Sequence, residues 1–195
     1  MSSLYWMWEK EFTPEWCQDV IDRAGNDFEE AQFFSGDLSG ASELNTKFRR
    51  TNIHWNSDQD LFDIAFHYMK VANKSGGWNF QVDVAEDFQI GQYPKGGHYD
   101  WHVDGLGIDP INAPNNKLLH GRTRKISMVV WLNEGFQGGG FQFHEVYQGK
   151  NVINLIKPKQ GTIIMFPSWM MHRVTPVKKG IRYSMVSWFL GRPVQ

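Results

Sequence analysis

Two copies of a His-x-Asp pattern lie close together in the segment GGHYDWHVDG, residues 96–105. The first copy is His98 with Asp100, and the second is His102 with Asp104. Side chains two residues apart on a β-strand point to the same face, so either copy could offer an imidazole nitrogen and a carboxylate oxygen to one metal ion. The geometry of a strand alone does not choose between the two copies.

A third ligand for such a metal must come from elsewhere in the chain. Among the other histidines His172 is placed best, because it begins a predicted strand whose hairpin partner carries Arg182. Two histidines and one carboxylate leave open positions on the metal, which is the arrangement found in non-haem Fe(II) oxygenases. On the returning strand, Arg182 could hold the far carboxylate of a keto-acid co-substrate through paired hydrogen bonds.

Two blocks of the sequence resemble prolyl 4-hydroxylases of the Fe(II)/2-oxoglutarate dioxygenase superfamily. The block YPKGGHYDWHVD, residues 93–104, resembles their Tyr-x-x-Gly-x-x-Tyr-x-x-His-x-Asp signature. The block HRVTPVKKGIRYS, residues 172–184, is similar to the part of these enzymes that carries the distal histidine and the arginine. The resemblance covers residues 88–190 and, with the first predicted helix, extends over the whole chain.

The resemblance fixes the register of the first block. It implies that His102, Asp104 and His172 bind Fe(II) and form the catalytic centre. In that register His98 and Asp100 occupy variable or spacer positions.

The resemblance also implies a site for 2-oxoglutarate, with O2 as the second co-substrate and ascorbate as an optional reductant. Arg182 would bind the C5 carboxylate of 2-oxoglutarate, with Ser184 facing the same side and Tyr93 donating a hydrogen bond. Trp131 stands where relatives often have a tyrosine that touches 2-oxoglutarate. An indole donates through a single N–H, so we expect a different arrangement there.

Three further residues, Tyr99, Arg124 and Trp188, occupy positions that face the peptide in prolyl 4-hydroxylases. The resemblance therefore implies hydroxylation of a C–H bond, most directly in peptidyl proline, with release of succinate and CO2. Phe189 and Leu190 follow Trp188 where prolyl 4-hydroxylases offer a histidine, a difference that concerns proline specificity and not the metal chemistry.

Other functions have to be weighed against this one. The same chemistry could act on another amino-acid side chain or a small molecule, or the protein could bind metal or peptide without turnover. A nucleic-acid demethylase would be expected to have a second arginine shortly after Arg182, where this chain has Trp188. A halogenase would replace Asp104 with a small residue.

Two helices are predicted before residue 78. Thr13 and Pro14 are typical of a helix start, and that helix runs to Gly25. Ser57-Asp58 predicts the start of a second helix that ends before Gly76.

From residue 78 the apolar pattern changes to a period of two, which predicts strands. We expect them at residues 79–84, 88–94, 98–104, 124–132, 141–146, 151–156, 162–166, 172–176 and 181–190. This order favours an α+β fold with a double-stranded β-helix, or jelly-roll, barrel.

The chain of 195 residues is predicted to form a single dioxygenase domain, residues 1–195. Helical support over about residues 1–77 would precede a barrel over about residues 78–190. The polar segment 35–46 is predicted to be a loop, either a lid or a plain surface loop. Segment 105–123 is predicted to be a long loop of the kind that is usually functional or disordered, and the sequence leaves open whether either loop forms a lid.

Composition narrows the cellular setting and the partners. The formal net charge is −1 without a long basic run, which argues against broad nucleic-acid binding. The single cysteine, Cys17, allows no intrachain disulfide and suggests a reducing compartment. Neither a signal peptide nor an apolar run of about 20 residues is visible. We therefore expect a cytoplasmic protein with a polypeptide substrate and no membrane partner, in an oligomeric state that the sequence leaves open.

Overall fold

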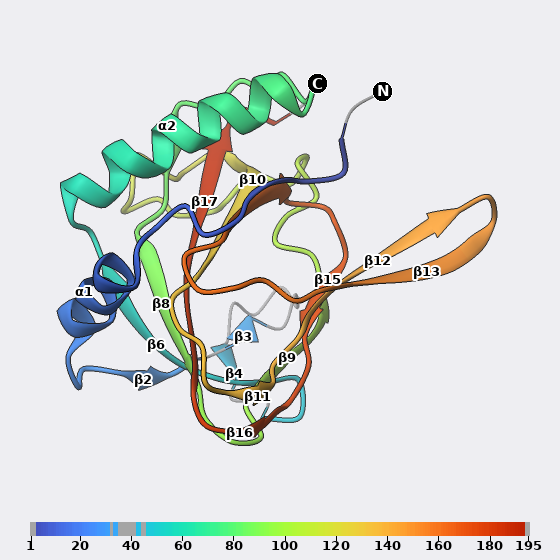
Figure 1. The fold of residues 1–195 in the computed structure, drawn as a ribbon. Coiled ribbons are helices and arrows are strands. Elements are labelled where there is room, and N and C mark those ends of the chain that lie inside the picture. Colours follow the sequence, from blue (N-terminus) through green and yellow to red (C-terminus); the bar gives the residue numbers. More distant parts are fainter. Residues whose placement is uncertain (1–2, 32, 35–41, 44–45, 194–195) are drawn as a thin grey trace.

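The computed structural model describes residues 3–31, 33–34, 42–43 and 46–193. Most of its regular structure is antiparallel sheet, in two layers (Figure 1). The larger sheet has the strand order β1-β14-β10-β17-β8-β6-β2, with β7 beside β17, and the smaller has the order β13-β12-β15-β9-β5.

The strands of the larger sheet come from both halves of the chain. They are β1 (Trp6–Trp8), β2 (Glu29–Glu30), β6 (Asn52–Asn56), β7 (Val84–Ala85), β8 (Phe88–Tyr93), β10 (Thr123–Trp131), β14 (Ile163–Pro167) and β17 (Arg182–Gly191). The smaller sheet contains β5 (Arg49–Arg50), β9 (His98–His102), β12 (Phe141–Tyr147), β13 (Lys150–Ile156) and β15 (His172–Val174). Two short pairs complete the structure, β3 (Phe33–Phe34) with β4 (Ser42–Glu43) and β11 (Gln137–Gly138) with β16 (Val177–Lys179).

Both predicted helices are confirmed, as α1 (Pro14–Ala24) and α2 (Gln59–Ser75). The Thr13 hydroxyl accepts a hydrogen bond from the backbone N–H of Trp16 at 3.2 Å, which caps α1. Both helices lie against the outer face of the larger sheet (Figure 1), where their apolar stripes share one buried core with the sheet.

The alternation of side chains along β10 separates two cores. Ile126, Met128 and Val130 face the helices, whereas Val129 and Trp131 face the smaller sheet. The same alternation along β17 turns Met185 and Phe189 toward the helices and places Arg182, Ser184, Val186 and Trp188 between the two sheets. A strand of this kind can therefore fill a core with one face and build a site with the other.

Several sequence predictions are corrected by the structure. Residues 79–83 form no strand, and β7 begins only at Val84, because the backbone N–H and C=O of Phe80 are both bonded to the side chain of Asn73. Before residue 78 the chain is not only helical, since it contributes several strands to the two sheets. The predicted loop between β9 and β10 is confirmed, because residues 103–122 contain no helix or strand.

The predicted loop at residues 35–46 lies almost wholly outside the described residues. Its described part includes β4, which pairs with β3. Within the described chain, no helix is long and apolar enough to span a membrane.

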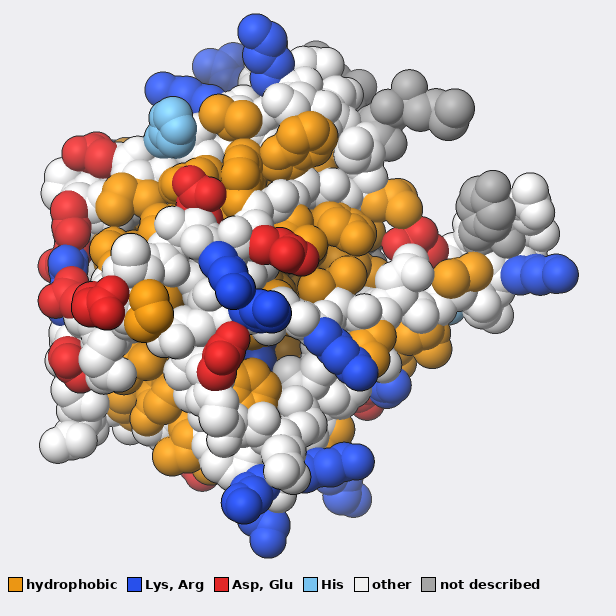
Figure 2. Space-filling model, viewed as in Figure 1, with side chains coloured by type: hydrophobic (Ala, Val, Ile, Leu, Met, Phe, Trp, Pro, Cys, Tyr) orange, Lys and Arg blue, Asp and Glu red, His pale blue; other side chains and the backbone are white. Residues whose placement is uncertain are grey.

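The β12–β13 hairpin projects away from the two-layered body (Figures 1 and 2). On the face shown in Figure 2, acidic and basic side chains are interspersed among apolar ones. The part of the hairpin next to the body pairs with β15, so this long element also helps to place His172.

One turn ties the N-terminal segment to the larger sheet. The backbone of Gly161 donates to the Trp131 carbonyl at 2.8 Å and accepts from the Phe12 N–H at 3.1 Å. Its φ is +78°, and a Cβ atom at this position would overlap the carbonyl oxygen of Phe12. Only glycine meets both requirements without moving the backbone.

We predict that Gly161→Ala lowers the free energy of unfolding by about 2–4 kcal/mol, through a positive φ and a backbone clash together. Gly149→Ala is the matched control, because Gly149 has a φ of +74° and its Cβ would meet no atom within 4 Å. The control should lose only about 1 kcal/mol. Equal losses for the two variants in urea unfolding would contradict the steric argument.

Candidate metal centre and co-substrate site

Three predicted ligands converge between the two sheets. One ligand atom from each of His102, Asp104 and His172 lies within 4.8 Å of the others. The Nε2 atom of His102 is 3.7 Å from Oδ1 of Asp104, and Nε2 of His172 is 3.6 Å from Oδ2. All three side chains are buried, so the donor atoms face one small space that could hold a metal ion.

The backbone sets the orientation of both imidazole rings. Nδ1 of His102 is 2.7 Å from the carbonyl oxygen of Asp100, and Nδ1 of His172 is 2.8 Å from that of Met170. A carbonyl oxygen can only accept a hydrogen bond, so each Nδ1 carries a proton. In the neutral ring Nε2 then has its lone pair free, which is the tautomer that a metal requires.

The protonation states of the cluster also suit a metal. Burial, and then the neighbouring His172, lower the pKa of His102 to about 3. Burial raises the pKa of the Asp104 carboxyl, but His172 and His102, together with Arg124 and the hydrogen bond from Ser127, bring it below its ordinary value. A neutral imidazole and an ionised carboxylate are the ligand forms, so a cation need not displace protons from these two groups at neutral pH.

A pair of buried serine hydroxyls supports the carboxylate of Asp104, one in direct contact and one behind it. Ser127 Oγ donates to Oδ2 at 2.6 Å and lies 3.0 Å from Ser168 Oγ. The backbone N–H of Asp104 donates to the Ser168 carbonyl at 2.9 Å. Since β9 ends at His102, these contacts, and not strand pairing, position Asp104.

The first His-x-Asp copy does not join the cluster. Both ring nitrogens of His98 contact backbone carbonyls, those of Gly96 at 3.0 Å and Lys47 at 2.9 Å. The exposed Asp100 accepts a hydrogen bond from the backbone N–H of Trp101. The structure therefore distinguishes the two His-x-Asp copies, which strand parity alone could not: only the second copy lies in the cluster with His172.

Arg182 lies in the same cavity as the three ligands and is fully buried. Its Nη1 donates to Ser184 Oγ at 3.0 Å, while Nε and Nη2 have no hydrogen-bond partner among the described residues. Burial lowers the pKa of Arg182, and Tyr93 partly offsets this. A buried guanidinium with unpaired donors fits a carboxylate ligand in chemistry and in charge.

Two aromatic rings enclose the Arg182 guanidinium. Its Cζ atom is 4.8 Å from the ring centroid of Tyr93 and 5.7 Å from that of Trp131. Tyr93 lines the cavity, whereas Trp131 is not among the side chains that line it. The structure therefore places Tyr93 on the cavity wall beside Arg182, and Trp131 near the guanidinium but outside the cavity lining.

Of the three predicted substrate residues, Tyr99 and Trp188 line this cavity, and Arg124 lines a neighbouring one together with them. Tyr99 stacks on His102 with ring centroids 3.5 Å apart, and burial raises its phenol pKa to about 12. Arg124 lies over Trp188 at 3.9 Å and is held by Glu86 through two hydrogen bonds of 2.6 and 2.7 Å. The charge of Arg124 is thus matched by a neighbouring carboxylate, a partner that the sequence did not reveal.

Arg49 is a cavity residue that the sequence analysis did not single out. Its Nη2 donates to Gln89 Oε1 at 2.6 Å, and its guanidinium lies 4.5 Å from the ring centroid of Tyr99. Its buried Nε has no hydrogen-bond partner among the described residues. The signal was weak, because Arg49 comes from a two-residue strand whose pairing with β9 spans about fifty residues of chain.

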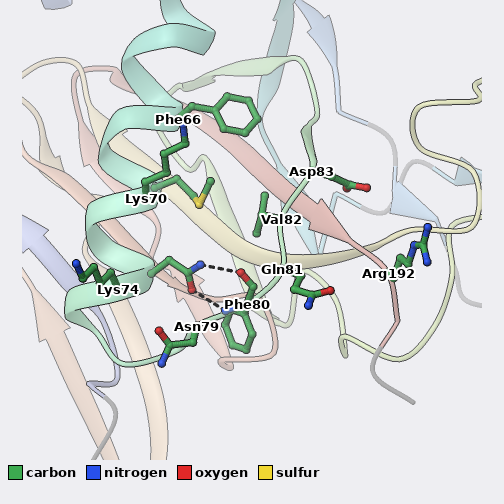
Figure 3. Close-up of a pocket in the computed structure, with 11 residues that line it drawn as sticks. Phe66, Lys70, Lys74, Asn79, Phe80, Gln81, Val82, Asp83 and Arg192 are labelled. Carbon is green, nitrogen blue, oxygen red and sulfur yellow. Dashed lines mark hydrogen bonds between the residues drawn. The ribbon is translucent and has the colours of Figure 1, made fainter.

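A different cavity, of about 480 Å³, lies between α2 and the segment that follows it (Figure 3). Lys70 and Lys74 border it on the helix, and Phe80 and Asp83 border it on the segment. Its lining contains no histidine or cysteine, and its one carboxylate, Asp83, is paired with Arg122 at 2.9 Å. This cavity lacks the donor set of the His102 cluster.

Comparison with known proteins agrees with the site. The family model of the 2OG-Fe(II) oxygenase superfamily matches residues 88–190. A PKHD-type hydroxylase of Synechococcus sp. (strain CC9311) is 26% identical over 183 residues, which cover 88% of this chain and 71% of that protein. Other PKHD-type hydroxylases align over 51% of this chain and only 39–42% of their own length.

Solved structures share the fold over nearly the whole chain. A Pseudomonas putida prolyl-4-hydroxylase superposes with a TM-score of 0.68 at 18% identity, covering 97% of this chain and 94% of that one. A viral collagen prolyl hydroxylase from Paramecium Bursaria Chlorella virus-1, in a 2OG complex, gives a TM-score of 0.66 at 21% identity and covers 97% of each chain. With a family model that matches more than half of its residues, this chain belongs to the 2OG-Fe(II) oxygenase superfamily, and it shares its fold with prolyl hydroxylases.

Proposed function

We propose that this chain is an Fe(II)- and 2-oxoglutarate-dependent dioxygenase that hydroxylates a prolyl residue of a polypeptide and releases succinate and CO2. The observation that carries the proposal is the presence, in one buried cavity, of a His-Asp-His cluster and a guanidinium with unpaired donors. The first can hold a metal, and the second can hold the far end of a dicarboxylate.

In this proposal His102, Asp104 and His172 hold Fe(II) and are the catalytic centre. With 2-oxoglutarate and O2, Fe(II) supplies the oxidising power for hydroxylation of a C–H bond. The hydrogen bonds to Nδ1 of the two histidines and to Oδ2 of Asp104 fix the directions of the ligand atoms. The protein's task is to orient these groups and to keep water out.

Arg182 and Ser184 would bind the C5 carboxylate of 2-oxoglutarate, and Tyr93 would contribute its hydroxyl to the same group. Trp131 would support the guanidinium from behind, in place of the tyrosine that relatives often have. A buried cation that lacks an anionic partner lowers the stability of the fold. Binding of a dicarboxylate at Arg182 would offset this loss, because the carboxylate would pair with the free donors.

Tyr99, Arg124 and Trp188 would contact the polypeptide near the hydroxylated residue. Glu86 neutralises Arg124 and fixes its position. We therefore assign Arg124 the role of a fixed hydrogen-bond donor on the cavity wall, and not that of an unpaired cation that attracts the substrate. Two fold neighbours are prolyl hydroxylases and a third is a prolyl hydroxylase in complex with a peptide fragment, which supports a polypeptide substrate.

The proposal includes a single domain over residues 1–195 with a jelly-roll barrel and a cytoplasmic location. The facing antiparallel sheets and the fold neighbours support the barrel. Ascorbate is retained as an optional reductant. Hydroxylation of another side chain or a small molecule is the alternative, whereas a binding module without turnover would have no use for Arg182 in its buried position.

The two His-x-Asp copies offer a matched test of this function. We predict that the Fe(II)-loaded protein forms succinate in a peptide-dependent manner and adds about 16 Da, one oxygen atom, to proline-containing peptides. Asp104→Ala should lower this turnover by at least about 100-fold, since a metal ligand is lost. Asp100→Ala should leave it within about twofold, because Asp100 is exposed and outside the cluster.

Mass spectrometry of the peptides and quantification of succinate check both expectations. Equal losses in the two variants would contradict the assignment of the second copy. Succinate formation with oxygen added to residues other than proline would contradict prolyl hydroxylation and support the alternative, hydroxylation of another side chain.

We further predict that Arg182→Met raises the free energy of unfolding of the metal-free protein by about 1–2 kcal/mol, because a buried cation with unpaired donors is removed. The same variant should lose the increase in melting temperature that 2-oxoglutarate gives the Mn(II)-loaded wild type. Arg173→Met is the control, since Arg173 bonds Gln142 outside the cavity. An equal 2-oxoglutarate shift in Arg182→Met and wild type would contradict the assigned carboxylate site.

A further inference from the structure

A wide cavity of about 520 Å³ adjoins the metal cluster. It shares Arg49, Gln89, Tyr99, Asp104 and Trp188 with the cavity that holds the three ligands, so the two spaces are direct neighbours. At its far side the lining comes from the end of the larger sheet, with residues of β2 and β6. A polypeptide that reaches the metal would pass this wall.

The register of the sheet aligns three side chains on that wall. Glu29 pairs with Ile53, and Trp55 lies two residues further along β6. Side chains two apart on a strand share a face, as do directly paired residues on neighbouring strands, so Glu29, Ile53 and Trp55 face the same way. All three line the cavity, and the Trp55 side chain is 47% exposed.

The charges of the cavity wall are not all compensated. Arg124 is paired with Glu86, and Arg49 bonds Gln89 and lies against Tyr99. Asp104 belongs to the metal cluster. Glu29 and Glu30 both line the cavity, are exposed and make no ion pair with any described residue. By strand parity only Glu29 shares a face with Trp55, so its negative charge is available to a ligand beside the indole.

We propose that Glu29 and Trp55 form a subsite for a Lys or Arg side chain of the polypeptide substrate. The indole face attracts a cation, and the carboxylate beside it pairs with the same cation. This inference rests on the proposed function, because it names a feature of the substrate that the metal centre would hydroxylate.

The position of the subsite limits where the cation lies in the substrate. The Trp55 ring centroid is 6.4 Å from that of Trp188, which lines both cavities. An extended peptide advances about 3.3 Å per residue, so the basic residue would lie within a few residues of the hydroxylated one. A neutral or acidic residue at that place would lack both attractions and, if acidic, would be repelled by Glu29.

A peptide library tests the subsite. Every peptide carries one central proline and random residues at the four positions on each side, and mass spectrometry reads the residues that flank the hydroxylated proline. For the wild type we expect enrichment of Lys and Arg at one flanking position by about three- to tenfold. The enrichment should disappear in Glu29→Gln, weaken in Trp55→Leu and change to Asp and Glu in Glu29→Lys.

Glu9→Gln is the matched control, because Glu9 is exposed and lines neither cavity, and it should keep the wild-type preference. Hydroxylation without any preference for basic residues would overturn the subsite and leave the proposed function intact. If no peptide is hydroxylated, the library is passed over the immobilised Mn(II)-loaded protein, and mass spectrometry identifies the residues that flank proline in the retained peptides. Lys and Arg enrichment in that fraction would support the subsite while the prolyl function fails, and its absence would overturn both.

Discussion

The antiparallel pairing of β9 with β15 is the constraint on which the site depends. It places His172 directly opposite His102 in the smaller sheet, so two ligands from distant parts of the chain meet on one face. The pairing of β15 with β12, and of β12 with β13, extends that sheet and holds β15 from its other side. A shift of either strand by one residue would turn its imidazole to the opposite face and away from the other one.

The third ligand depends on a different kind of support. Asp104 lies beyond the end of β9, where backbone contacts to Ser168 and the Ser127 hydroxyl replace strand pairing. Ser127 comes from β10 of the larger sheet, so the carboxylate joins the two layers. The His102–Asp104–His172 cluster therefore links the two sheets: both histidines lie on the smaller sheet, and the carboxylate is bonded to the larger one.

Arg182 is held in the fold as a buried cation with unpaired donors. The inward face of β17 brings Arg182 and Ser184 into the space between the sheets, while its outward face packs on the helices. Apolar packing on the outward face fixes the strand and keeps the guanidinium in place although its donors are not all paired. A buried cation of this kind costs stability, which the proposed binding of a dicarboxylate would offset.

The sequence predicted site residues that lie within short blocks, but it did not predict those that long-range strand pairing brings together. The His102, His172 and Arg182 positions could be predicted because each lies in a short block whose spacing is itself distinctive. The positions of Arg49, Trp55 and Glu29 on the cavity walls could not, because these residues lie on short strands that meet β9, β8 and β6 through long-range pairing. The predicted strand at residues 79–84 was wrong for a local reason, since hydrogen bonds from the Asn73 amide override an alternating apolar pattern.

The central claim is that one cavity holds both the metal and 2-oxoglutarate, and an anaerobic titration tests it most directly. The Fe(II)-loaded protein is titrated with 2-oxoglutarate, and the weak visible charge-transfer absorption that marks chelation of iron is followed. The account predicts a saturable band that is absent in His102→Ala and needs much higher 2-oxoglutarate in Arg182→Ala. A wild type that binds Fe(II) but gives no band, or a band unaffected by the loss of His102, would contradict it.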